Sequence, residues 1–137
     1  MKITCIFVNI SEEFVKQVRN FFRLSEFNLR CVFVSNDVDE ITEMIFNYAE
    51  KENDLLLVFG GVDTREGATS SIALKRICDQ RVYTLETLVC EMLAREKRCL
   101  LTSPTVGMRR KTLIMCLPQD ESVFNIISLA IGALKGG

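Results

Sequence analysis

The sequence predicts an α/β protein, a three-layer α/β/α sandwich with a mostly parallel sheet, and three observations lead to this prediction. Strand-like and helix-like segments alternate along the chain at the spacing of βαβ units. Residues 55–59 form a continuous apolar run without alternation, which is typical of a strand buried on both faces. Paired glycines follow this run directly, and a segment with helical spacing comes next, so the run is expected to end in a strand-to-helix turn.

The first half of the chain contains three expected strands and two expected helices. Residues 2–9 and 30–34 are β-rich, and residues 55–59 are the third strand. Ser11 is placed to cap the first helix, and Asn36 or Asp37 begins the second, with Asp37 and Glu40 spaced as a capping pair. Both helices have an apolar stripe at helical spacing, formed by Phe14, Val18, Phe21 and Phe22 and by Ile41, Met44, Ile45 and Tyr48.

The second half continues the alternation. Residues 69–78 and 83–98 are expected helices, and residues 121–134 are the last one. Residues 99–102 are short and β-like, and residues 112–117 form a further strand that ends at Pro118. The side chains expected to face inward are Ile72, Ala73, Ile77 and Cys78 in the first of these helices, and Leu85, Leu88, Val89, Met92 and Leu93 in the second.

Length, composition and charge narrow the class of protein. The 137 residues fit one compact domain, so 1–137 is treated as a single domain. Hydrophobic residues make up 48% and charged residues 26%, as in soluble globular proteins. A net charge of −1 offers no basic face for nucleic acid, and the cluster Arg109–Lys111 is expected to be a solvated strand entrance. No apolar stretch reaches the roughly 20 residues that cross a bilayer. We expect a cytoplasmic protein without nucleic-acid or membrane partners.

The cysteines and the absence of histidine exclude several chemistries. None of the six cysteines forms a CxxC pair, and the chain has no histidine, which removes the usual zinc spacings and histidine-based nucleophile activation. Four cysteines lie in or beside strand-like runs, where a free thiol behaves as a small hydrophobe: Cys5, Cys31, Cys99 and Cys116. We expect all thiols to be reduced.

Three loops are expected to meet at one edge of the sheet, because ligands of such folds lie beyond the C-terminal ends of the strands. They are residues 35–37, residues 60–69 and the turn at Pro118. Gly60 and Gly61 allow backbone N–H groups to approach an anion, and the following helix N-terminus adds partial positive charge. The alternative is a tight turn that binds nothing.

With these loops, residues from about 28 to 135 resemble the molybdopterin-binding domain family, the Mog-like proteins of molybdenum-cofactor biosynthesis. The family motif Gly-Gly-Thr-Gly, then Arg-Asp and Thr, matches Gly60-Gly61-Val62-Asp63, Arg65-Glu66 and Thr69. A Pro-Asp-Asp-like turn matches Ser35-Asn36-Asp37. Downstream, the family's Ser-Arg turn matches Thr102-Ser103-Pro104, and the glycine after it matches Gly107. The family's Thr-Leu-Ile-type strand matches residues 112–114, and its Leu-Pro-Gly matches Leu117-Pro118-Gln119. The chain departs from the family at Asn36, Val62, Asp63, Glu66 and Gln119.

The resemblance implies binding of molybdopterin through its phosphate and, in some members, adenylylation of that phosphate with Mg-ATP. Carried over to matching positions, it makes Asp37 and Glu66 candidate catalytic residues and Asp37, Asp63 and Glu66 candidate Mg²⁺ ligands. Phosphoryl-type transfer depends on positioning and charge, so a metal and an arginine can suffice without histidine. The candidate substrate-binding residues are Asn36, Gly60, Gly61, Val62, Asp63, Thr64, Arg65, Thr69, Ser70, Thr102, Ser103, Gly107 and Pro118.

Each candidate also has a purely structural interpretation. Asp37 can be a helix cap, Asp63 a turn former, and Arg65 the partner of a neighbouring carboxylate. Thr69 and Ser70 can simply begin a helix, and Thr102 and Ser103 can be turn residues before Pro104. Two functions therefore stay open: a divergent molybdopterin adenylyltransferase, and a binding or scaffold protein that kept the fold without the chemistry.

The family commonly forms trimers, so the resemblance also implies a homotrimer. The helix with Tyr83, Leu88 and Met92, together with Leu134, can supply an interface, although core burial is the expected use of these side chains.

Overall fold

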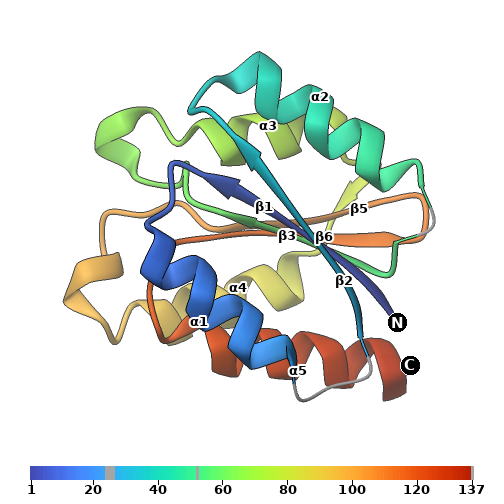
Figure 1. Cartoon of the computed structure of the whole chain (residues 1–137). Helices are drawn as coiled ribbons and strands as arrows, with labels where there is room; N and C mark the ends of the chain where they lie inside the picture. Colours follow the sequence, from blue (N-terminus) through green and yellow to red (C-terminus); the bar gives the residue numbers. More distant parts are fainter. Residues whose placement is uncertain (24–26, 52, 137) are drawn as a thin grey trace.

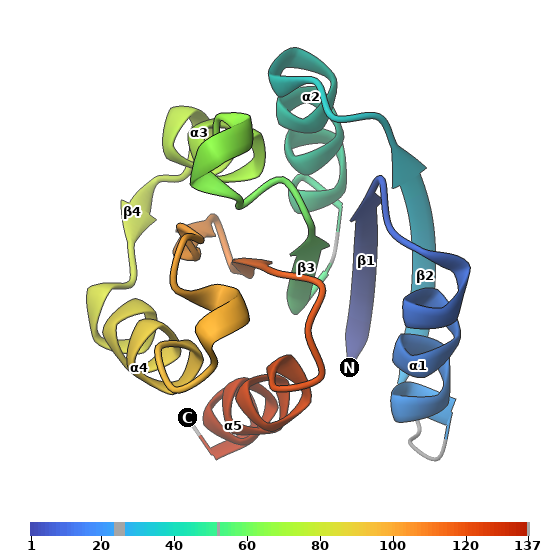
Figure 2. The same cartoon turned by 90° about the vertical axis from the view of Figure 1, so that its left-hand side faces the viewer.

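The structure is a computed structural model, and it describes residues 1–23, 27–51 and 53–136. One six-stranded sheet runs through the molecule in the order β2-β1-β3-β6-β5-β4 (Figure 1). Strands β1 (Lys2–Val8), β2 (Asn28–Val34), β3 (Leu55–Phe59) and β6 (Thr112–Leu117) are mutually parallel. At the edge opposite β2, β5 (Thr105–Arg109) pairs antiparallel with β6, and β4 (Gln80–Arg81) pairs antiparallel with β5 (Figure 2). The three-layer fold with a mostly parallel sheet is confirmed.

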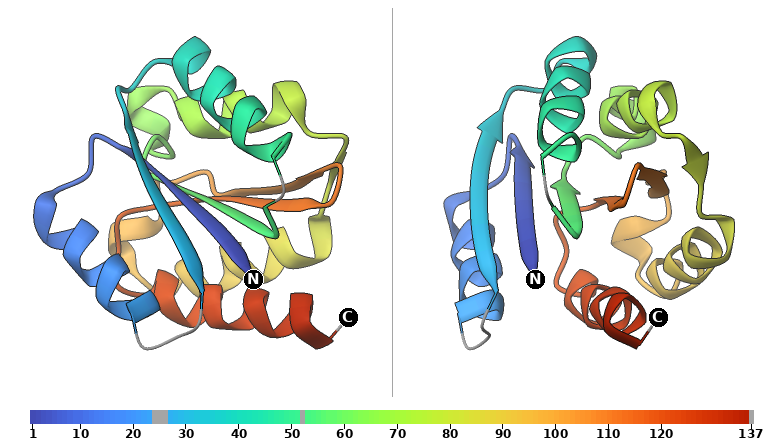
Figure 3. Two further views of the ribbon diagram at one scale, coloured as in Figure 1. Left: turned by 45° about the vertical axis from the view of Figure 1, so that its right-hand side comes forward. Right: turned by 90° about the vertical axis from the view of Figure 1, so that its right-hand side faces the viewer.

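Helices cover both faces of the sheet (Figure 3). On one face lie α1 (Glu12–Arg23), α4 (Tyr83–Leu93) and α5 (Val123–Gly136), whose apolar side chains join the larger core cluster. On the other lie α2 (Val38–Ala49) and α3 (Thr69–Ile77), which share a second cluster with the opposite side of the strands. All five residues of β3 are buried, as the unbroken apolar run predicts.

The predicted caps and apolar stripes of the first two helices are largely confirmed. Ser11 Oγ accepts a hydrogen bond from Phe14 N at 3.3 Å, and Asp37 Oδ2 accepts one from Glu40 N at 2.9 Å. The carboxylate of Glu40 accepts from Ser35 Oγ, so only one half of the expected reciprocal capping pair forms. Phe14 packs edge-on against Phe59 of β3, with ring centroids 5.4 Å apart, and this contact fixes the start of α1 beside the end of β3.

The expected inward stripe of α3 is confirmed at Ala73, Ile77 and Cys78, which lie in or pack against the second core cluster, and is wrong at Ile72. Ile72 is 41% exposed, whereas Leu74 is fully buried beside Ala73. The reason lies in two small polar residues, Ser70 and Ser71, which are themselves buried because their hydroxyls bond to backbone carbonyl oxygens of neighbouring loops. These hydrogen bonds turn the serine side toward the sheet and leave Ile72 outside.

Several expectations for residues 83–109 are also wrong. The helix α4 ends at Leu93 instead of residue 98, and residues 97–99 form a short 3₁₀ helix, η2. Of the β-like segment expected at residues 99–102, only Thr102 forms an isolated bridge. Within the expected inward stripe, Leu88 is 40% exposed, while Val89 and Leu93 are buried. The missed strand β5 carries Gly107 and follows Pro104. It pairs with β6 through a hairpin turn where Arg110 has φ 53°, and with β4 on its other side. Arg109 ends this strand and pairs with Glu50 at 3.0 Å instead of being solvated.

The thiols behave as the sequence predicts. All six cysteines are free, and Cys5, Cys99 and Cys116 are buried. Burial raises the pKa of the Cys5 thiol, with the neighbouring Cys31 adding to the effect, and burial also raises the pKa of Cys116. Within the described ranges, no helix combines the length and apolar character that a bilayer crossing requires.

Candidate functional site

The loops that follow β1, β3 and β6 meet at one edge of the sheet around a cavity of about 290 Å³. We call it the glycine cavity. Asn36 reaches it from the loop after β2, so the three predicted loops do meet at this edge, and the loop after β1, which was not predicted, joins them. Its lining consists of Val8, Asn9, Ile10, Asn36, Gly60, Gly61, Val62, Asp63, Glu66, Arg98, Thr102, Pro118 and Gln119.

The paired glycines are required by backbone conformation and by close packing. Gly60 and Gly61 have φ 91° and 67°, which side chains other than glycine rarely adopt. A Cβ on Gly60 would lie 2.4 Å from the Val8 carbonyl oxygen, and one on Gly61 would lie 2.3 Å from Ser70 Oγ. Gly60 N donates to the Leu117 carbonyl oxygen at 2.9 Å, so this N–H is engaged within the fold and Gly60 contributes lining only. The pair holds the β1, β3 and α3 backbones together at the cavity.

Asp63 and Arg65 form an ion pair at the entrance of the glycine cavity. Asp63 caps the 3₁₀ helix η1 (Thr64–Glu66) and accepts from Arg65 N at 2.9 Å, Arg65 Nε at 3.1 Å and Arg65 NH2 at 2.9 Å. These hydrogen bonds from the arginine side chain and backbone hold the pKa of the Asp63 carboxyl below its ordinary value. Arg65 therefore offsets the negative charge that Asp63 brings to the loop.

Only two of the three carboxylates predicted to bind Mg²⁺ lie in the glycine cavity. Glu66 and Asp63 line the glycine cavity, whereas Asp37 caps α2 and lies outside the lining. Among the residues that the structure describes, no group of three or more acidic, cysteine or histidine side chains is placed to hold a metal ion. A magnesium ion here would have at most the two lining carboxylates, and the ion usually binds through one or two carboxylates, substrate phosphates and water.

Several hydroxyl-bearing side chains that were predicted to bind substrate instead form hydrogen bonds that connect neighbouring loops. Thr69 Oγ1 bonds to Asn36 Oδ1 and so connects the loop after β2 to the start of α3. Ser70, fully buried, donates from Oγ to the Gly60 carbonyl oxygen at 2.8 Å. Thr64 Oγ1 donates to the Leu101 carbonyl oxygen at 2.7 Å. Of these four side chains, only Asn36 also lines the cavity.

Of the substrate-binding residues predicted in the second half of the chain, two line the glycine cavity and two do not. Thr102 and Pro118 line the glycine cavity, and Thr102 forms an isolated antiparallel bridge with Asp63. Ser103 N donates to the Val62 carbonyl oxygen at 2.8 Å, which supports the loop from behind. Gly107 lies within β5, outside the cavity, where a Cβ would come within 3.0 Å of Cys78 Cβ.

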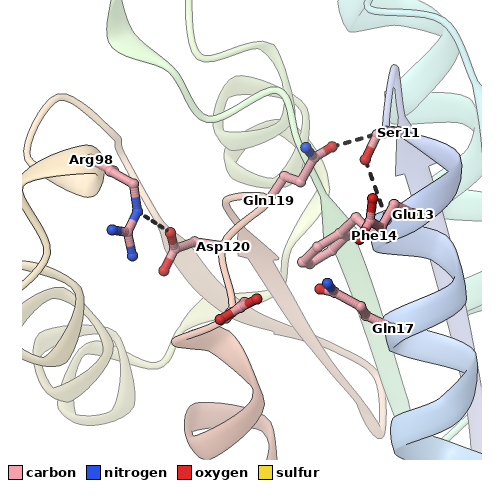
Figure 4. Close-up of a pocket in the computed structure, with 8 residues that line it drawn as sticks. Ser11, Glu13, Phe14, Gln17, Arg98, Gln119 and Asp120 are labelled. Carbon is pink, nitrogen blue, oxygen red and sulfur yellow. Dashed lines mark hydrogen bonds and ion pairs between the residues drawn. The ribbon is translucent and has the colours of Figure 1, made fainter.

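A second cavity of about 460 Å³, which we call the helix-end cavity, adjoins the first and shares Arg98 and Gln119 with it. Figure 4 shows Arg98 and Asp120 on one side, residues of α1 on the other and Gln119 between them. Its lining consists of Ser11, Glu13, Phe14, Gln17, Arg98, Gln119, Asp120 and Glu121. Sequence reasoning missed this cavity because Arg98 was expected in a helix, although the run Asp120-Glu121-Ser122 before an apolar helix is a recognisable capping signal.

Asp120 and Arg98 form the central ion pair of this region. Arg98 Nε lies 2.7 Å from Asp120 Oδ1, and Asp120 Oδ2 accepts from Ser122 N at 3.1 Å. Burial by itself raises the pKa of the Asp120 carboxyl, but the hydrogen bonds from Arg98 and Ser122 outweigh burial and hold this pKa below its ordinary value. Asp120 is therefore a charged cap beside α5 at neutral pH.

The fold is shared with solved structures of cofactor-biosynthesis proteins. One is a molybdopterin biosynthesis protein from Mycobacterium abscessus, with a TM-score of 0.83 and 16% identity, covering 98% of this chain and 92% of that one. Another is the molybdopterin biosynthesis enzyme MoaB from Thermus thermophilus, with a TM-score of 0.79 and 19% identity, covering 99% and 97%. A third is the tungsten cofactor synthesizing protein MoaB from Pyrococcus furiosus, with a TM-score of 0.75 and 17% identity, covering 98% and 94%.

At these identities the comparisons establish a common fold, which confirms the fold that the sequence motifs predicted. No protein-family model matches the chain, and no curated protein matches it. What the chain binds therefore has to be argued from the site.

Proposed function

We propose that this protein binds molybdopterin in molybdenum-cofactor biosynthesis. The observation that carries the proposal is the glycine cavity at the C-terminal ends of the parallel strands, in a fold shared with molybdopterin biosynthesis proteins. The phosphate of the ligand would lie against the loop that begins at Gly61, with Thr102 and Asn36 on either side. Val62 is buried and gives this loop a fixed anchor.

Charge on the lip of the cavity is compatible with a phosphate. An uncompensated Asp63 would repel it, but Arg65 NH2 lies 2.9 Å from Asp63 Oδ2 and offsets that charge. Arg98, which also lines the cavity, provides a second cation and is anchored by Asp120 at 2.7 Å. With Asp63 paired to Arg65 and Arg98 paired to Asp120, Glu66 is the carboxylate of the described lining that has no ion-pair partner, so a phosphate bound there would need a cation beside it.

A second candidate function is adenylylation of the bound phosphate with Mg-ATP. The observation that favours it is the presence of Asp63 and Glu66 in one cavity lining, since Mg²⁺ needs few protein carboxylates when phosphates complete its shell. In this role Glu66 would bind the ion and Arg98 would stabilise charge on the phosphoryl group. The engagement of Asp63 by Arg65 and of Asp37 as a helix cap favours binding without turnover.

One experiment separates these functions. Purified protein is incubated with molybdopterin, with and without Mg-ATP, and both retained pterin and adenylylated pterin are quantified. Retained pterin without product supports a carrier or scaffold, and product that disappears in Glu66→Ala supports the enzyme. Asp37→Ala tests the other candidate catalytic carboxylate, and Glu91→Ala on α4 is the matched control, because Glu91 is exposed and lies outside both cavity linings. Absence of retained pterin from folded protein would refute the proposal.

We also propose a homotrimer. On α4, Tyr83 is 64% exposed and Leu88 is 40% exposed, so two apolar side chains of the expected interface point to solvent, whereas Met92 and Leu134 pack against the core. Solution scattering is expected to give the mass of three chains, and Leu88→Glu is expected to lower it. A monomer mass for the unmodified protein would contradict the proposal.

A further inference from the structure

A third cavity, of about 800 Å³, lies at the end of the sheet opposite the glycine cavity, where the parallel strands begin. Figure 3 shows β1 entering the sheet from this end, beside the label of the chain's first residue. We call it the basic cavity. A side pocket of about 130 Å³ adjoins it and shares Lys2, Lys51 and Asn53 with it.

Basic side chains outnumber acidic ones in the linings of the basic cavity and its side pocket. Within the described part of the chain, which leaves out residue 52, the acidic side chains are Glu50 and Asp54, and the basic ones are Lys2, Arg30, Lys51, Arg110 and Lys111. The whole chain has a net charge of −1, so positive charge is concentrated at this end of the sheet.

Both acidic side chains already accept hydrogen bonds from the fold. Glu50 accepts from Arg109 Nε at 3.0 Å and pairs with Arg110 Nε at 2.7 Å. Asp54 Oδ2 accepts from Lys2 N at 2.7 Å, which connects the start of β3 to the start of β1. These carboxylates are therefore occupied by groups other than the remaining lysines and arginine of the two linings.

Three basic side chains of the linings form no ion pair with any residue that the structure describes: Arg30, Lys51 and Lys111. Arg30 Cζ and Lys51 Nζ lie 5.6 Å and 4.6 Å from the centroid of the same Tyr48 ring, so an aromatic ring, and not an anion, holds these two like charges. The C-terminal end of α2 supplies about half a negative charge, which offsets at most one of the three cations. The excess positive charge favours an anionic ligand.

The floor of the basic cavity is held in place by hydrogen bonds of the fold itself. Thr4 Oγ1 donates to Asn53 Oδ1 at 2.8 Å, and Asn53 Nδ2 donates to the Tyr48 carbonyl oxygen at 2.7 Å. Thr112 Oγ1 donates to the Asn53 carbonyl oxygen at 2.8 Å, and both threonines are buried. The cavity is therefore formed before any ligand arrives, as small-molecule sites usually are.

The hairpin turn between β5 and β6 brings two of the basic side chains to the basic cavity. Arg110 has φ 53°, a conformation that glycine or asparagine adopts more readily, and Lys111 follows it in the turn. Arg110 N donates to Asp79 Oδ2 at 2.6 Å, so the turn keeps this conformation with basic residues in place.

We propose that the basic cavity and its side pocket bind a small-molecule polyphosphate. Lys51 lines both spaces, whereas Arg30 lines only the side pocket and Lys111 only the basic cavity, so Lys51 connects the two ends of a row of cations. A chain of two or three phosphates reaches further along this row than a single phosphate does, and each phosphate forms charge-assisted hydrogen bonds. The volume of about 800 Å³ suits a small molecule and leaves room for a group attached to the chain.

The test titrates the protein calorimetrically with inorganic triphosphate and with orthophosphate, without Mg²⁺, at about 0.1 M salt, where charges beyond about 10 Å are screened. Triphosphate is expected to bind at least tenfold more tightly than orthophosphate. Lys51→Gln is expected to weaken triphosphate binding at least fivefold. Lys75→Gln on α3 removes the same charge from an exposed lysine outside both linings, and it is expected to change the affinity less than twofold.

A second variant tests the row of cations. The double substitution Arg30→Gln and Lys111→Gln keeps Lys51 and is expected to reduce the preference for triphosphate over orthophosphate to threefold or less. An unchanged preference in this variant would overturn the proposal, and so would equal weakening by Lys51→Gln and Lys75→Gln, because net charge alone would then explain the binding. Absence of triphosphate binding by the unmodified protein would also overturn it.

Amide NMR places the bound triphosphate. The largest chemical-shift changes are expected on Lys51, Asn53 and Thr112, and largest changes on Gly61 and Val62 would assign the triphosphate to the glycine cavity and overturn the proposal. The same titration with ATP distinguishes two sources of the phosphate chain. Tighter binding of ATP at the same amides assigns a nucleotide, equal binding assigns the phosphate chain alone, and both results support the site. The test uses no pterin, so its outcome is independent of the proposed function.

Discussion

The close backbone approach at Gly60 can be tested by comparing three glycine substitutions. In Gly60→Ala, the φ of 91° adds about 1–2 kcal/mol of strain for an L-residue. The new Cβ would also lie 2.4 Å from the Val8 carbonyl oxygen, and forcing backbone apart in a packed region costs about 1–3 kcal/mol more. We expect Gly60→Ala to lower the free energy of unfolding by about 2–5 kcal/mol, a large share of the roughly 5–15 kcal/mol of a typical domain.

Two other glycines provide matched controls. Gly67 has the same φ of 91°, but a Cβ there would meet no atom within 4 Å, so Gly67→Ala isolates backbone strain and is expected to cost about 1–2 kcal/mol. Gly132 lies in α5 with equally open surroundings, and Gly132→Ala is expected to stabilise by about 0.5–1 kcal/mol. Urea unfolding followed by far-UV circular dichroism measures all three, since the chain has no tryptophan. If Gly60→Ala cost no more than Gly67→Ala, the argument from close packing would be refuted.

Three further predictions concern the polar groups around the cavities. Asp120→Asn is expected to lower the free energy of unfolding by about 1–2 kcal/mol at pH 7. Because folding lowers the pKa of the Asp120 carboxyl, its stabilising contribution is full above the unfolded pKa of about 4 and disappears as the pH falls through the folded pKa. Urea titrations of the unmodified protein and the variant at several pH values would show this loss. Ser70→Ala is expected to cost about 1–2 kcal/mol in the same unfolding assay, because the Gly60 carbonyl oxygen loses its buried donor; a change below 0.5 kcal/mol would contradict this reasoning. Arg65→Ala is expected to return the pKa of Asp63 toward its ordinary value, measured by NMR titration of the carboxyl group, and to weaken retention of molybdopterin; an unchanged pKa would contradict the pairing.

Local signals made much of the fold predictable from the sequence. The run 55–59 and the two glycines after it identify a buried strand and its turn, because burial on both faces and positive φ each require particular residue types at particular positions. The caps at Ser11 and Asp37 are equally local, since a short side chain bonds to a backbone N–H three residues ahead.

The parts that were missed depend on contacts between distant residues. The strand β5 is short and interrupted by Gly107, so its sequence alone does not mark it as a strand, and it pairs with residues 112–116 of β6 and with β4. The outward position of Ile72 on α3 goes with the inward positions of Ser70 and Ser71, whose hydroxyls bond to carbonyl oxygens of two other loops. Helical periodicity contains no information about either effect.

The candidate site shows the same division. The loops that gather at the sheet edge were predicted, because the topology of a parallel sheet brings its C-terminal ends together. The sequence did not predict the ion pair of Arg98 with Asp120 or the hydrogen bond between Gln119 and Ser11. Each of these contacts joins two segments that are distant in the sequence and come together only in the folded chain.

The central claim is that molybdopterin binds at the C-terminal edge of the sheet, and amide NMR of isotope-labelled protein titrated with molybdopterin tests it most directly. The account predicts that the largest chemical-shift changes fall on Gly61, Val62 and Thr102, around the glycine cavity. Largest changes at the opposite edge, on Lys51, Asn53 and Thr112, or saturating molybdopterin without any change, would contradict it.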